Sequence, residues 1–433
     1  MKIMKFGGSS VADYPQMVKV FDILNNTQGK KIVVLSACKG ITDKLEQAAI
    51  LATEKTTNHS VNKNSILKSI ENHHINILKS VLQKCLSPAI EAVNNLFKEL
   101  QNILEGISFL NELTDATRDS VLAFGELLST TIFHFLCKEK GIENALWDAR
   151  NLIYTDNNYN NATPIIKLCD ENITKEYEKI NADLVIIQGF IGSYNDGIIR
   201  KTTTLGRGGS DYSASIIGSI LNAEEIQIWT DVDGVLSADP RLYNNAFTIK
   251  QMTFEEIKDL SFWGAKVLHP KTIQPAIEKN INIKVLNTFN PSNHGTLITA
   301  NFSNKNFVIN SVVAKENCIL NIASKNISSD FSNDILYSNY CNKTFINLLD
   351  GKNISEKIAN NSLNFPCSVI CICGSNLGNN YALFSNFLSK LNFLEDVDIL
   401  QIIFGFSFNS VLLVVGKCDI HKVVSEIHKV MLK

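Results

Sequence analysis

Short apolar runs typical of β-strands alternate with longer helix-like runs through residues 1–300 of this chain. Each strand-like run is rich in Val and Ile and is bounded by Gly, Ser, Asp or Asn. The runs predicted as strands are Lys2–Phe6, Lys31–Ser36, Asp183–Phe190, Glu225–Thr230 and Ile281–Leu286. This alternation predicts an α/β fold in which helices cover both faces of a sheet, a three-layer αβα sandwich.

The apolar period becomes helical between residues 64 and 107, on either side of Pro88, which predicts two packed helices with a structural role. A third helix is predicted over Thr117–Lys140, and it carries Glu126 among apolar neighbours. A carboxylate in such surroundings requires a cation. The sequence therefore favours a functional role for Glu126 over that of an exposed helix carboxylate.

A different region follows the polar, turn-rich residues 290–306. Its final part, residues 368–431, predicts an orderly β-α-β-β-α unit. Residues 319–360 predict the same unit with one helix reduced or missing, with strands at Ile319–Ala323, Ile335–Tyr340 and Thr344–Leu349 and a short helix after Gly351. We therefore expect an α/β domain and an α+β region of two modules, with a strand near 307–313 shared between the modules. The expected domains are 1–300, 301–362 and 363–433.

Charge and hydropathy argue against two classes of partner. The chain has 41 Lys and Arg against 43 Asp and Glu, a formal net charge of −2, and no run of five basic residues. Nucleic acid and anionic membranes are therefore not predicted as partners. The N-terminus lacks the pattern of a signal peptide, and no window approaches the roughly 18 uncharged apolar residues of a membrane helix.

Ten cysteines are spread from Cys38 to Cys418 without a C-x-x-C pair, and the histidines have no metal-ligand spacing. Cys371 and Cys373 would share one face of an apolar strand. This pattern predicts buried, reduced thiols in a cytoplasmic protein, with disulfides or metal binding as the alternatives.

A glycine-rich turn, Lys5–Ser10, directly follows the first predicted strand. Glycines let the backbone approach a phosphate, and Lys5 supplies a positive charge. The pattern alone also fits an ordinary strand-to-helix turn. The chain contains neither the P-loop pattern G-x-x-x-x-G-K-[ST] nor the dinucleotide fingerprint G-x-G-x-x-G.

A second glycine-rich segment, Thr202–Asp211, precedes a helix-like run and holds Arg207 between two glycines. Such loops at helix starts are anion sites, and an arginine on an exposed backbone can fork onto a carboxylate. Two further segments are Thr230–Gly234, an acidic turn after a strand, and 264–270, where Lys266 and His269 precede Pro270. Acidic turns at the carboxyl edge of a sheet are common ligand sites.

Taken in order, these segments resemble the aspartokinases of the amino acid kinase family over residues 1–300. The motifs that carry the resemblance are K-F-G-G-S-S at 5–10, F-G-E-L at 124–127, T-L-G-R-G-G-S-D at 204–211, W-T-D-V-D-G at 229–234, D-P-R at 239–241 and G-A-K-V-L-H-P at 264–270. Other kinases of the family share the sandwich but not this set.

The resemblance implies transfer of the γ-phosphate of ATP to the β-carboxylate of L-aspartate, giving 4-phospho-L-aspartate, a first step towards lysine, threonine, methionine or diaminopimelate. It implies three catalytic residues, Lys5, Arg207 and Asp211. It implies that aspartate is bound by Ser36, Thr42, Glu126, Arg207 and Asp211. It implies that ATP is bound by Lys5, Gly7, Gly8, Ser9, Thr230, Asp231, Arg241, Lys266 and Val267. Mg²⁺ is expected to be held mainly by the nucleotide phosphates, with no dedicated protein metal site.

The sequence departs from the family pattern at two positions. Leu236 stands where relatives often have tyrosine, which leaves the adenine contacts open, and Phe124 stands where many have a polar or basic residue. In the family the tail is a pair of amino-acid-binding ACT modules, through which we expect a homodimer. Between Ala323 and Ile335, a stretch that contains the polar run 324–330, there is room for barely one helical turn, so we hypothesise weak, lost or altered feedback inhibition.

Two alternatives remain for the function. One is a kinase for another amino-acid carboxylate such as glutamate, because one methylene changes specificity by only about 1–3 kcal/mol. The other is a catalytically silent amino-acid-binding regulator, against which the combination of Lys5, Glu126 and Arg207 argues. A fused homoserine dehydrogenase is not expected, given the length and the missing dinucleotide fingerprint.

Overall fold

The structure is a computed structural model, and its chain divides into two compact units. The first comprises Met1–Gly234 with Lys271–Ala300, and the second comprises Val235–Pro270 with Asn301–Lys433. The residues described are 1–54, 57–241, 243–265, 268–300, 309–323, 334–341, 344–351, 362–391, 396–416, 418 and 420–431.

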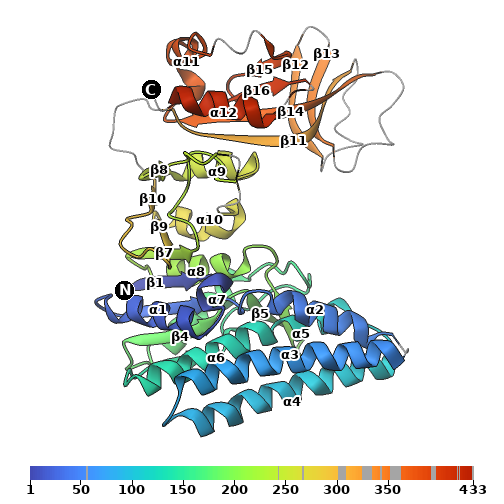
Figure 1. Cartoon of the computed structure of the whole chain (residues 1–433), viewed down its shortest axis with the longest axis vertical. Helices are drawn as coiled ribbons and strands as arrows, with labels where there is room; N and C mark the ends of the chain where they lie inside the picture. The colour runs from blue at the N-terminus through green and yellow to red at the C-terminus, as the bar shows by residue number, and fades with distance from the viewer. Residues whose placement is uncertain are drawn as a thin grey trace. The chain divides into compact units, whose positions relative to one another are not determined.

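The first unit is built on a largely parallel sheet with the strand order β3-β4-β2-β1-β7-β9-β10 (Figure 1). Only β10 runs antiparallel to its neighbour β9 among these strands. The strands are β1 Lys2–Phe6, β2 Lys31–Leu35, β3 Ala145–Trp147, β4 Leu184–Gln188, β7 Glu225–Thr230, β9 Asn282–Asn287 and β10 Thr296–Thr299. All five predicted strands are confirmed, with ends within two residues of the expected ones.

Helices and a separate hairpin complete this unit. The helices are η1 Gly8–Val11, α1 Tyr14–Asn25, α2 Ile41–Ala52, α3 Thr57–Val81, α4 Leu86–Leu110, α5 Asp115–Leu122, α6 Phe124–Glu139, η2 Ala149–Asn151, α7 Ile166–Tyr177, α8 Gly209–Ile220 and α10 Pro270–Glu278. Strands β5 Ile191–Asn195 and β6 Arg200–Thr204 pair as an antiparallel hairpin. The long helices α3 and α4 lie side by side, as the apolar period predicted (Figure 1).

Helices α8 and α6 pack on opposite faces of the sheet. A Cβ on Gly218 of α8 would lie within 3.4 Å of both Ile3 and Ile226. On the other side, Gln188 at the end of β4 donates a hydrogen bond to Thr130 of α6 at 2.9 Å. Because the register aligns Ile3 with Val185 through β2, Gln188 points to the face opposite Ile3. The predicted sandwich is confirmed.

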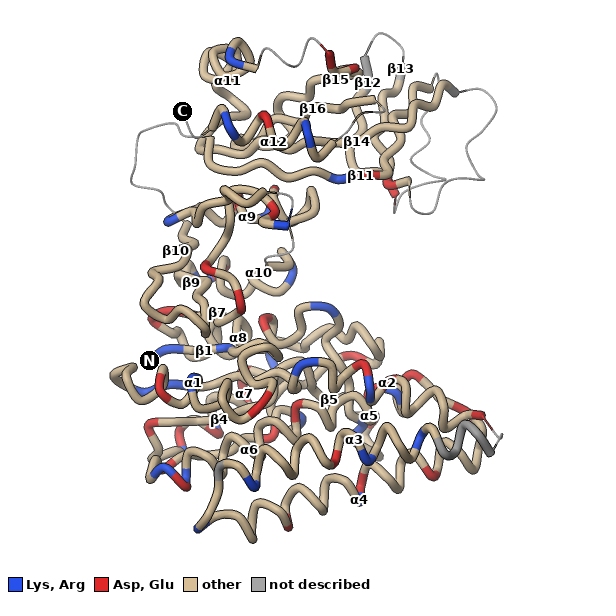
Figure 2. The backbone as a smooth tube through the Cα atoms, viewed as in Figure 1, with Lys and Arg blue, Asp and Glu red and all other residues tan. Residues whose placement is uncertain are grey.

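The helix predicted over residues 117–140 is interrupted at Ala123 and forms two helices, α5 and α6. The combined stretch Asp115–Glu139 is long and apolar enough to cross a membrane by composition, contrary to the expectation that no window approached this limit. In the structure 72% of its most apolar window is buried, as in the core helix of a folded domain. Figure 2 shows acidic and basic residues interspersed along the backbone.

The second unit contains an antiparallel sheet with the order β12-β13-β11-β14-β16-β15. Its elements are β8 Gln251–Thr253, α9 Phe254–Phe262, β11 Ile309–Ala323, β12 Ile335–Cys341, β13 Thr344–Asp350, β14 Ser362–Gly374, η3 Leu377–Asn379, α11 Tyr381–Leu388, β15 Ile399–Ile403, β16 Ser410–Val415 and α12 Ile420–Met431. The strands expected near 307–313 and at 319–323 form one continuous strand, β11, with an irregular register after Lys315. The predicted β-α-β-β-α order of the final part is confirmed.

Both faces of this second sheet are covered. One face carries a core that includes Ile370, Phe384 of α11 and Ile427 of α12, and the other carries the fully buried Trp263. Cys371 and Cys373 are buried on one face of β14, as predicted.

Residues 235–270 belong to the same compact unit as the C-terminal strands. The backbone N–H of Val312 on β11 donates to the carbonyl of Ser237 at 2.9 Å, and Asn310 bonds to Glu256 of α9 at 3.2 Å. The expected domain boundaries at 300 and 362 stay a prediction. The polar run 324–330, on which the hypothesis of altered feedback rests, and the short helix expected after Gly351 lie outside the described residues.

We expect Ile3→Ala to destabilise the first unit by about 2–5 kcal/mol, because Ile3 is fully buried in a central strand between two neighbours. The measurement is the midpoint of thermal unfolding, followed by circular dichroism. Ile50→Ala serves as the matched control, because Ile50 on α2 is 43% exposed and its replacement should change the midpoint little. Equal shifts for both variants would contradict the assignment of β1 to the core.

Candidate functional site

A cavity of about 570 Å³ lies at the carboxyl ends of β1, β2 and β4, beside the loop that leads into α8. Crevices at this edge of a parallel sheet are the usual ligand sites of α/β folds. Residues far apart in the sequence line it, namely Lys5, Gly8, Ser36–Gly40, Thr42, Asp43, Leu122, Glu126, Asn160, Phe190, Thr204 and Gly206–Ser210. The structure therefore brings Lys5, Gly8, Ser36, Thr42, Glu126 and Arg207, all predicted site residues, around one cavity.

The turns after β1 and β2 are in direct contact. The N–H of Lys39 donates to the carbonyl of Gly8 at 3.1 Å, and the N–H of Ser36 donates to the carbonyl of Phe6 at 3.2 Å. A Cβ on Gly8 would lie 2.8 Å from the carbonyl oxygen of Ala37, closer than real side chains approach. Glycine is therefore required at position 8 by the approach of the neighbouring backbone.

Lys5 and Asp211 form an ion pair inside the first unit. The Lys5 Nζ lies 2.6 Å from Asp211 Oδ1, and only 12% and 13% of the two side chains are exposed. Because both side chains are largely shielded from water, the Coulomb attraction between them is screened less than at the surface. The pair fixes the ammonium group of β1 next to the first turn of α8.

Glu126 is buried in the cavity wall without a cation. Its Oε1 accepts a hydrogen bond from the N–H of Ala37 at 2.9 Å, whereas Oε2 is buried and has no hydrogen-bond partner in the described ranges of the chain. No Lys, Arg or His forms an ion pair with it within the described part of the chain. Burial raises the pKa of Glu126 to about 8, a rise that the bond from Ala37 opposes.

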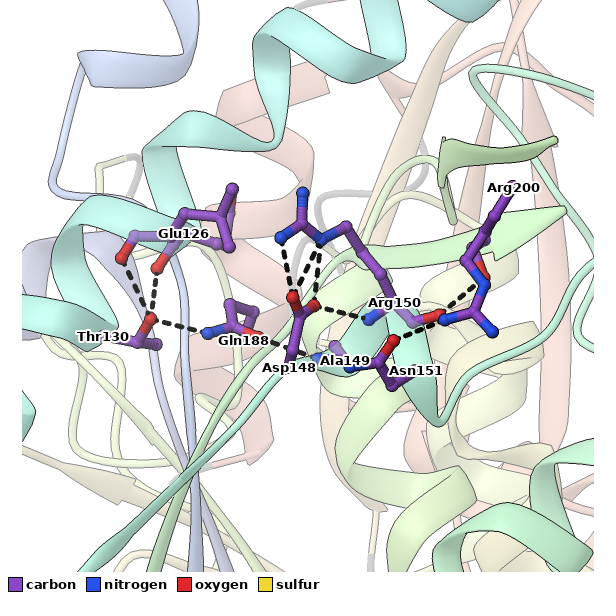
Figure 3. A network of polar contacts seen from close by, with 10 residues as sticks. Glu126, Thr130, Asp148, Ala149, Arg150, Asn151, Gln188 and Arg200 are labelled. Atoms are coloured by element: carbon purple, nitrogen blue, oxygen red, sulfur yellow. Dashed lines mark hydrogen bonds and ion pairs between the residues drawn. The ribbon is translucent and has the colours of Figure 1, made fainter. Parts of the chain in front are cut away.

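The backbone under Glu126 is fixed by a hydrogen-bonded chain (Figure 3). The Thr130 hydroxyl donates to the carbonyl of Glu126 at 2.7 Å and accepts from Gln188 at 2.9 Å. Gln188 in turn accepts from the N–H of Ala149 at 2.9 Å. Helix α6 is thereby joined to the end of β4 and to η2, so the carboxylate is presented from a rigid element.

Arg207 is exposed and lies between Gly206 and Gly208, whose φ angles are +74° and +73°. Both glycines adopt the left-handed conformation that other residues avoid, and Gly208 is the N-cap of α8. The structure gives Arg207 no ion pair with any described residue. The guanidinium is thus available for a ligand at a helix N-terminus, where backbone N–H groups also favour anions.

Two smaller predicted residues also lie in the cavity wall. The Ser36 hydroxyl donates to the hydroxyl of Ser210 at 2.9 Å, which joins the turn after β2 to the start of α8. Thr42 is in the first turn of α2. Both contribute hydroxyl groups to the lining.

The residues predicted for the nucleotide are only partly assembled. The N–H of Gly7 donates to the carbonyl of Trp229 at 3.1 Å, which places Gly7 beside the end of β7, where Thr230 and Asp231 follow. Ser9 lies in η1 directly after Gly8. Arg241 belongs to the second unit, where it pairs with Asp239, and Lys266 and Val267 lie outside the described residues.

Sequence reasoning missed Phe190, Asn160 and Thr204 in the cavity wall. Phe190 has a φ of +69°, a strained value for a bulky residue, and its N–H bonds to the Ser213 hydroxyl at 3.1 Å. The glycine after the strand was the only local signal of this turn. Asn160 and Thr204 reach the cavity through tertiary contacts, which no sequence pattern announces.

No group of three or more His, Cys, Asp or Glu side chains suited to a metal ion occurs among the residues that the structure describes. The described cysteines are free, and burial raises the pKa of Cys38, which lines the cavity, to about 12. This thiol is therefore not a nucleophile at neutral pH.

Comparison with known proteins identifies relatives of this arrangement. A family model described as the amino acid kinase family matches residues 1–287. The chain is 35% identical over 328 residues to aspartokinase 1, chloroplastic, of Arabidopsis thaliana, covering 74% of this chain and 56% of the relative. It is 34% identical over 302 residues to lysine-sensitive aspartokinase 3 of Escherichia coli, covering 68% and 63%. The chain thus spans little more than half the length of these curated relatives.

A solved structure resembles the whole chain. The crystal structure of E. coli aspartokinase III in complex with aspartate and ADP superimposes with a TM-score of 0.81 at 26% identity, covering 100% of both chains.

We expect Glu126→Gln to change how stability depends on pH. Since burial raises the pKa of Glu126 from 4.5 to about 8, the native state holds a proton that the unfolded state releases above about pH 4.5. Stability of the parent protein therefore falls by about 1.4 kcal/mol per pH unit between these values, and the glutamine variant lacks this loss. The free energy of unfolding of the Glu126→Gln variant, measured by chemical denaturation, should therefore rise relative to that of the parent from pH 5 to pH 8.

The control is Glu171→Gln, an exposed carboxylate on α7. A constant difference in stability between the Glu126→Gln variant and the parent across this pH range would contradict the assignment of a buried, cation-free carboxylate.

Proposed function

This chain belongs to the amino acid kinase family, and we propose that it is an ATP-dependent aspartate kinase. It transfers the γ-phosphate of ATP to the β-carboxylate of L-aspartate and gives 4-phospho-L-aspartate. The names of its relatives and the aspartate and ADP bound in the E. coli structure support this substrate pair.

One observation carries the proposal: the cavity combines an available guanidinium, a shielded ammonium and a buried carboxylate without a cation. Arg207 holds the α-carboxylate of aspartate in a fork, and Glu126 pairs with its α-ammonium. Ser36, Thr42 and Asp211 complete the acceptor pocket. An amino-acid dicarboxylate carries two carboxylates, which suit Arg207 and Lys5, and one ammonium, which suits Glu126. Its binding therefore pairs Glu126 without leaving another buried charge unpaired.

The reaction needs charge and position rather than a base. The attacking carboxylate has a reference pKa of about 3.9 and is ionised at neutral pH. Lys5 lies between the acceptor and the phosphates, where it stabilises the charge that spreads over the transferred phosphoryl group. Gly7, whose N–H bonds to Trp229, lets the backbone turn towards the phosphates, and the donors on Gly8 and Ser9 hold the phosphate oxygens. The carboxylate therefore attacks a phosphorus atom that is already in line.

On the nucleotide side the proposal assigns Thr230 and Asp231 at the end of β7, together with Arg241, Lys266 and Val267. Mg²⁺ would be held mainly by the nucleotide phosphates, and the carboxylate of Asp211, beside Lys5, would be the protein group placed to add an oxygen ligand. When bound, the ion neutralises phosphate charge.

For the C-terminal region we propose two ACT-like modules, through which the chain forms a homodimer. The β-α-β-β-α order of its final part and the antiparallel sheet support this assignment. We retain 1–300 as the catalytic domain and 301–362 and 363–433 as the modules. The free cysteines fit a cytoplasmic enzyme, and the lysine-sensitive relative fits a place in lysine biosynthesis.

Replacing Lys5 tests the reaction directly. We expect Lys5→Ala to lower the rate of acyl-phosphate formation from aspartate and ATP about 100- to 1,000-fold, because a preorganised charge at the transferred group is lost. Trapping the product as hydroxamate measures this rate. The exposed Lys30→Ala variant is the control.

Unchanged activity in the Lys5→Ala variant would remove this lysine from its role. Wild-type protein that binds aspartate in calorimetry yet forms no acyl phosphate would identify the silent regulator instead. A faster rate with glutamate than with aspartate would identify the other kinase.

Replacing Arg207 tests the acceptor pocket. We expect Arg207→Ala to raise the KM for aspartate about 10- to 100-fold and to leave the KM for ATP within about twofold, because one charge-assisted contact to the acceptor is removed. Arg200→Ala, on the adjoining strand β6, should change neither constant. A rise in the KM for ATP alone would instead assign Arg207 to the nucleotide.

A further inference from the structure

Asp119 on α5 is a fully buried carboxylate that is not among the predicted site residues. Its two oxygens accept from the N–H of Asn160 at 3.0 and 3.2 Å and from the N–H and hydroxyl of Thr204, both at 2.8 Å. No Lys, Arg or His pairs with it in the described part of the chain. Burial raises the pKa of Asp119, and these hydrogen bonds oppose the rise. They are therefore what makes the buried charge tolerable.

Both partners of Asp119 line the candidate acceptor cavity. Asn160 has a φ of +65° and belongs to the loop 156–163, which is closed by bonds from the N–H groups of Asn158 and Thr163 to the Asp156 carboxylate. Thr204 ends β6, directly before the turn that carries Arg207. One carboxylate thus connects the loop to the strand end, in addition to the backbone bond between Ala162 and Thr204.

The loop and the arginine turn are packed without spare room. A Cβ on Gly206 would lie 2.6 Å from Asn161 Oδ1 and 3.1 Å from the carbonyl oxygen of Asn160. The N–H of Ala162 also donates to the carbonyl of Thr204 at 2.9 Å. A shift of Asn160 therefore displaces Gly206 and with it the backbone of Arg207.

We propose that Asp119 is a positioning residue that clamps the loop 156–163 to the end of β6, so that Asn160 and Arg207 together form the wall that receives the acceptor's α-carboxylate end. The wall is assembled before the substrate binds. The identity of the acceptor rests on the proposed function. The hydrogen bonds of Asp119 that form the clamp are present without substrate.

The substitution Asp119→Asn is designed to weaken the hydrogen bonds that hold the loop 156–163 without unfolding the protein. The asparagine amide offers one acceptor oxygen instead of two, and its NH₂ group opposes the N–H of Asn160, which is shared between both oxygens of Asp119. The bonds from Asn160, at 3.0 and 3.2 Å, are the longest of the four and are therefore weakened most, whereas the Thr204 hydroxyl can turn and accept from the NH₂ group. The loop should therefore loosen while β6 stays in place. We expect the KM for aspartate to rise about tenfold or more, the KM for ATP to stay within about twofold, and kcat to fall less than the KM rises. Asp115→Asn, an exposed position on the same helix, is the matched control.

Hydrogen–deuterium exchange without substrate tests the clamp independently of the reaction. The peptide covering 157–165 should exchange at least about fivefold faster in the Asp119→Asn variant than in wild type, and a protein without kinase activity would still give this result. Unchanged exchange, or equal rises in both KM values, would overturn the proposal.

A second pair of variants applies if Asp119→Asn does not fold. Thr204→Val keeps the N–H donor and removes the hydroxyl, whereas Thr204→Ser keeps both. Faster exchange of the loop in the valine variant but not in the serine variant supports the clamp, and equal exchange in the two contradicts it.

Discussion

A carboxylate buried without a cation is the constraint on which the candidate site depends. This carboxylate, on Glu126, accepts one hydrogen bond, from Ala37, and its other oxygen has no partner among the residues that the structure describes. An uncompensated charge in such surroundings destabilises the folded protein. Burial therefore favours the protonated form and raises the pKa of Glu126 to about 8. Binding of an ammonium removes the penalty. The energetic penalty of burying Glu126 in the free protein therefore favours ligands that carry an ammonium group. A ligand without a positive charge leaves the Glu126 carboxylate uncompensated.

The groups that complement Glu126 come together because of the strand order. Placing β1 between β2 and β7 brings the turns that follow these strands to one edge of the sheet, where α8 also begins. The contact between Gly8 and Ala37 requires a residue without a side chain. Lys5 then reaches Asp211 on α8, and Arg207 lies in the turn before it. The topology thus brings an ammonium and a guanidinium to one cavity.

The sequence predicted those features that depend on local chemistry. Val/Ile runs predicted five of the seven strands in the sheet of the first unit, all but β3 and β10, and glycine turns located Lys5 and Arg207. It failed where tertiary packing decides. The break at Ala123 leaves the apolar pattern uninterrupted, and β11 continues through a polar stretch that reads as a boundary between two strands. Packing of 235–270 with the C-terminal sheet depends on contacts of β11 that no local pattern contains. Asn160 and Phe190 reach the cavity by left-handed backbone turns for the same reason.

Asp119 and Glu126 differ in their hydrogen-bond partners, and this difference distinguishes a positioning residue, Asp119, from a ligand-binding residue, Glu126. Both are buried acids on neighbouring helices, and burial raises the pKa of each. Asp119 accepts from two backbone N–H groups and a hydroxyl, so its hydrogen-bonding capacity is used by the protein itself. Glu126 leaves one oxygen unused. A buried polar group whose hydrogen bonds are all made within the protein positions the surrounding backbone. A buried polar group that is left without a partner is a candidate ligand-binding group. The charge of the missing partner can therefore be inferred from the structure before any ligand is seen.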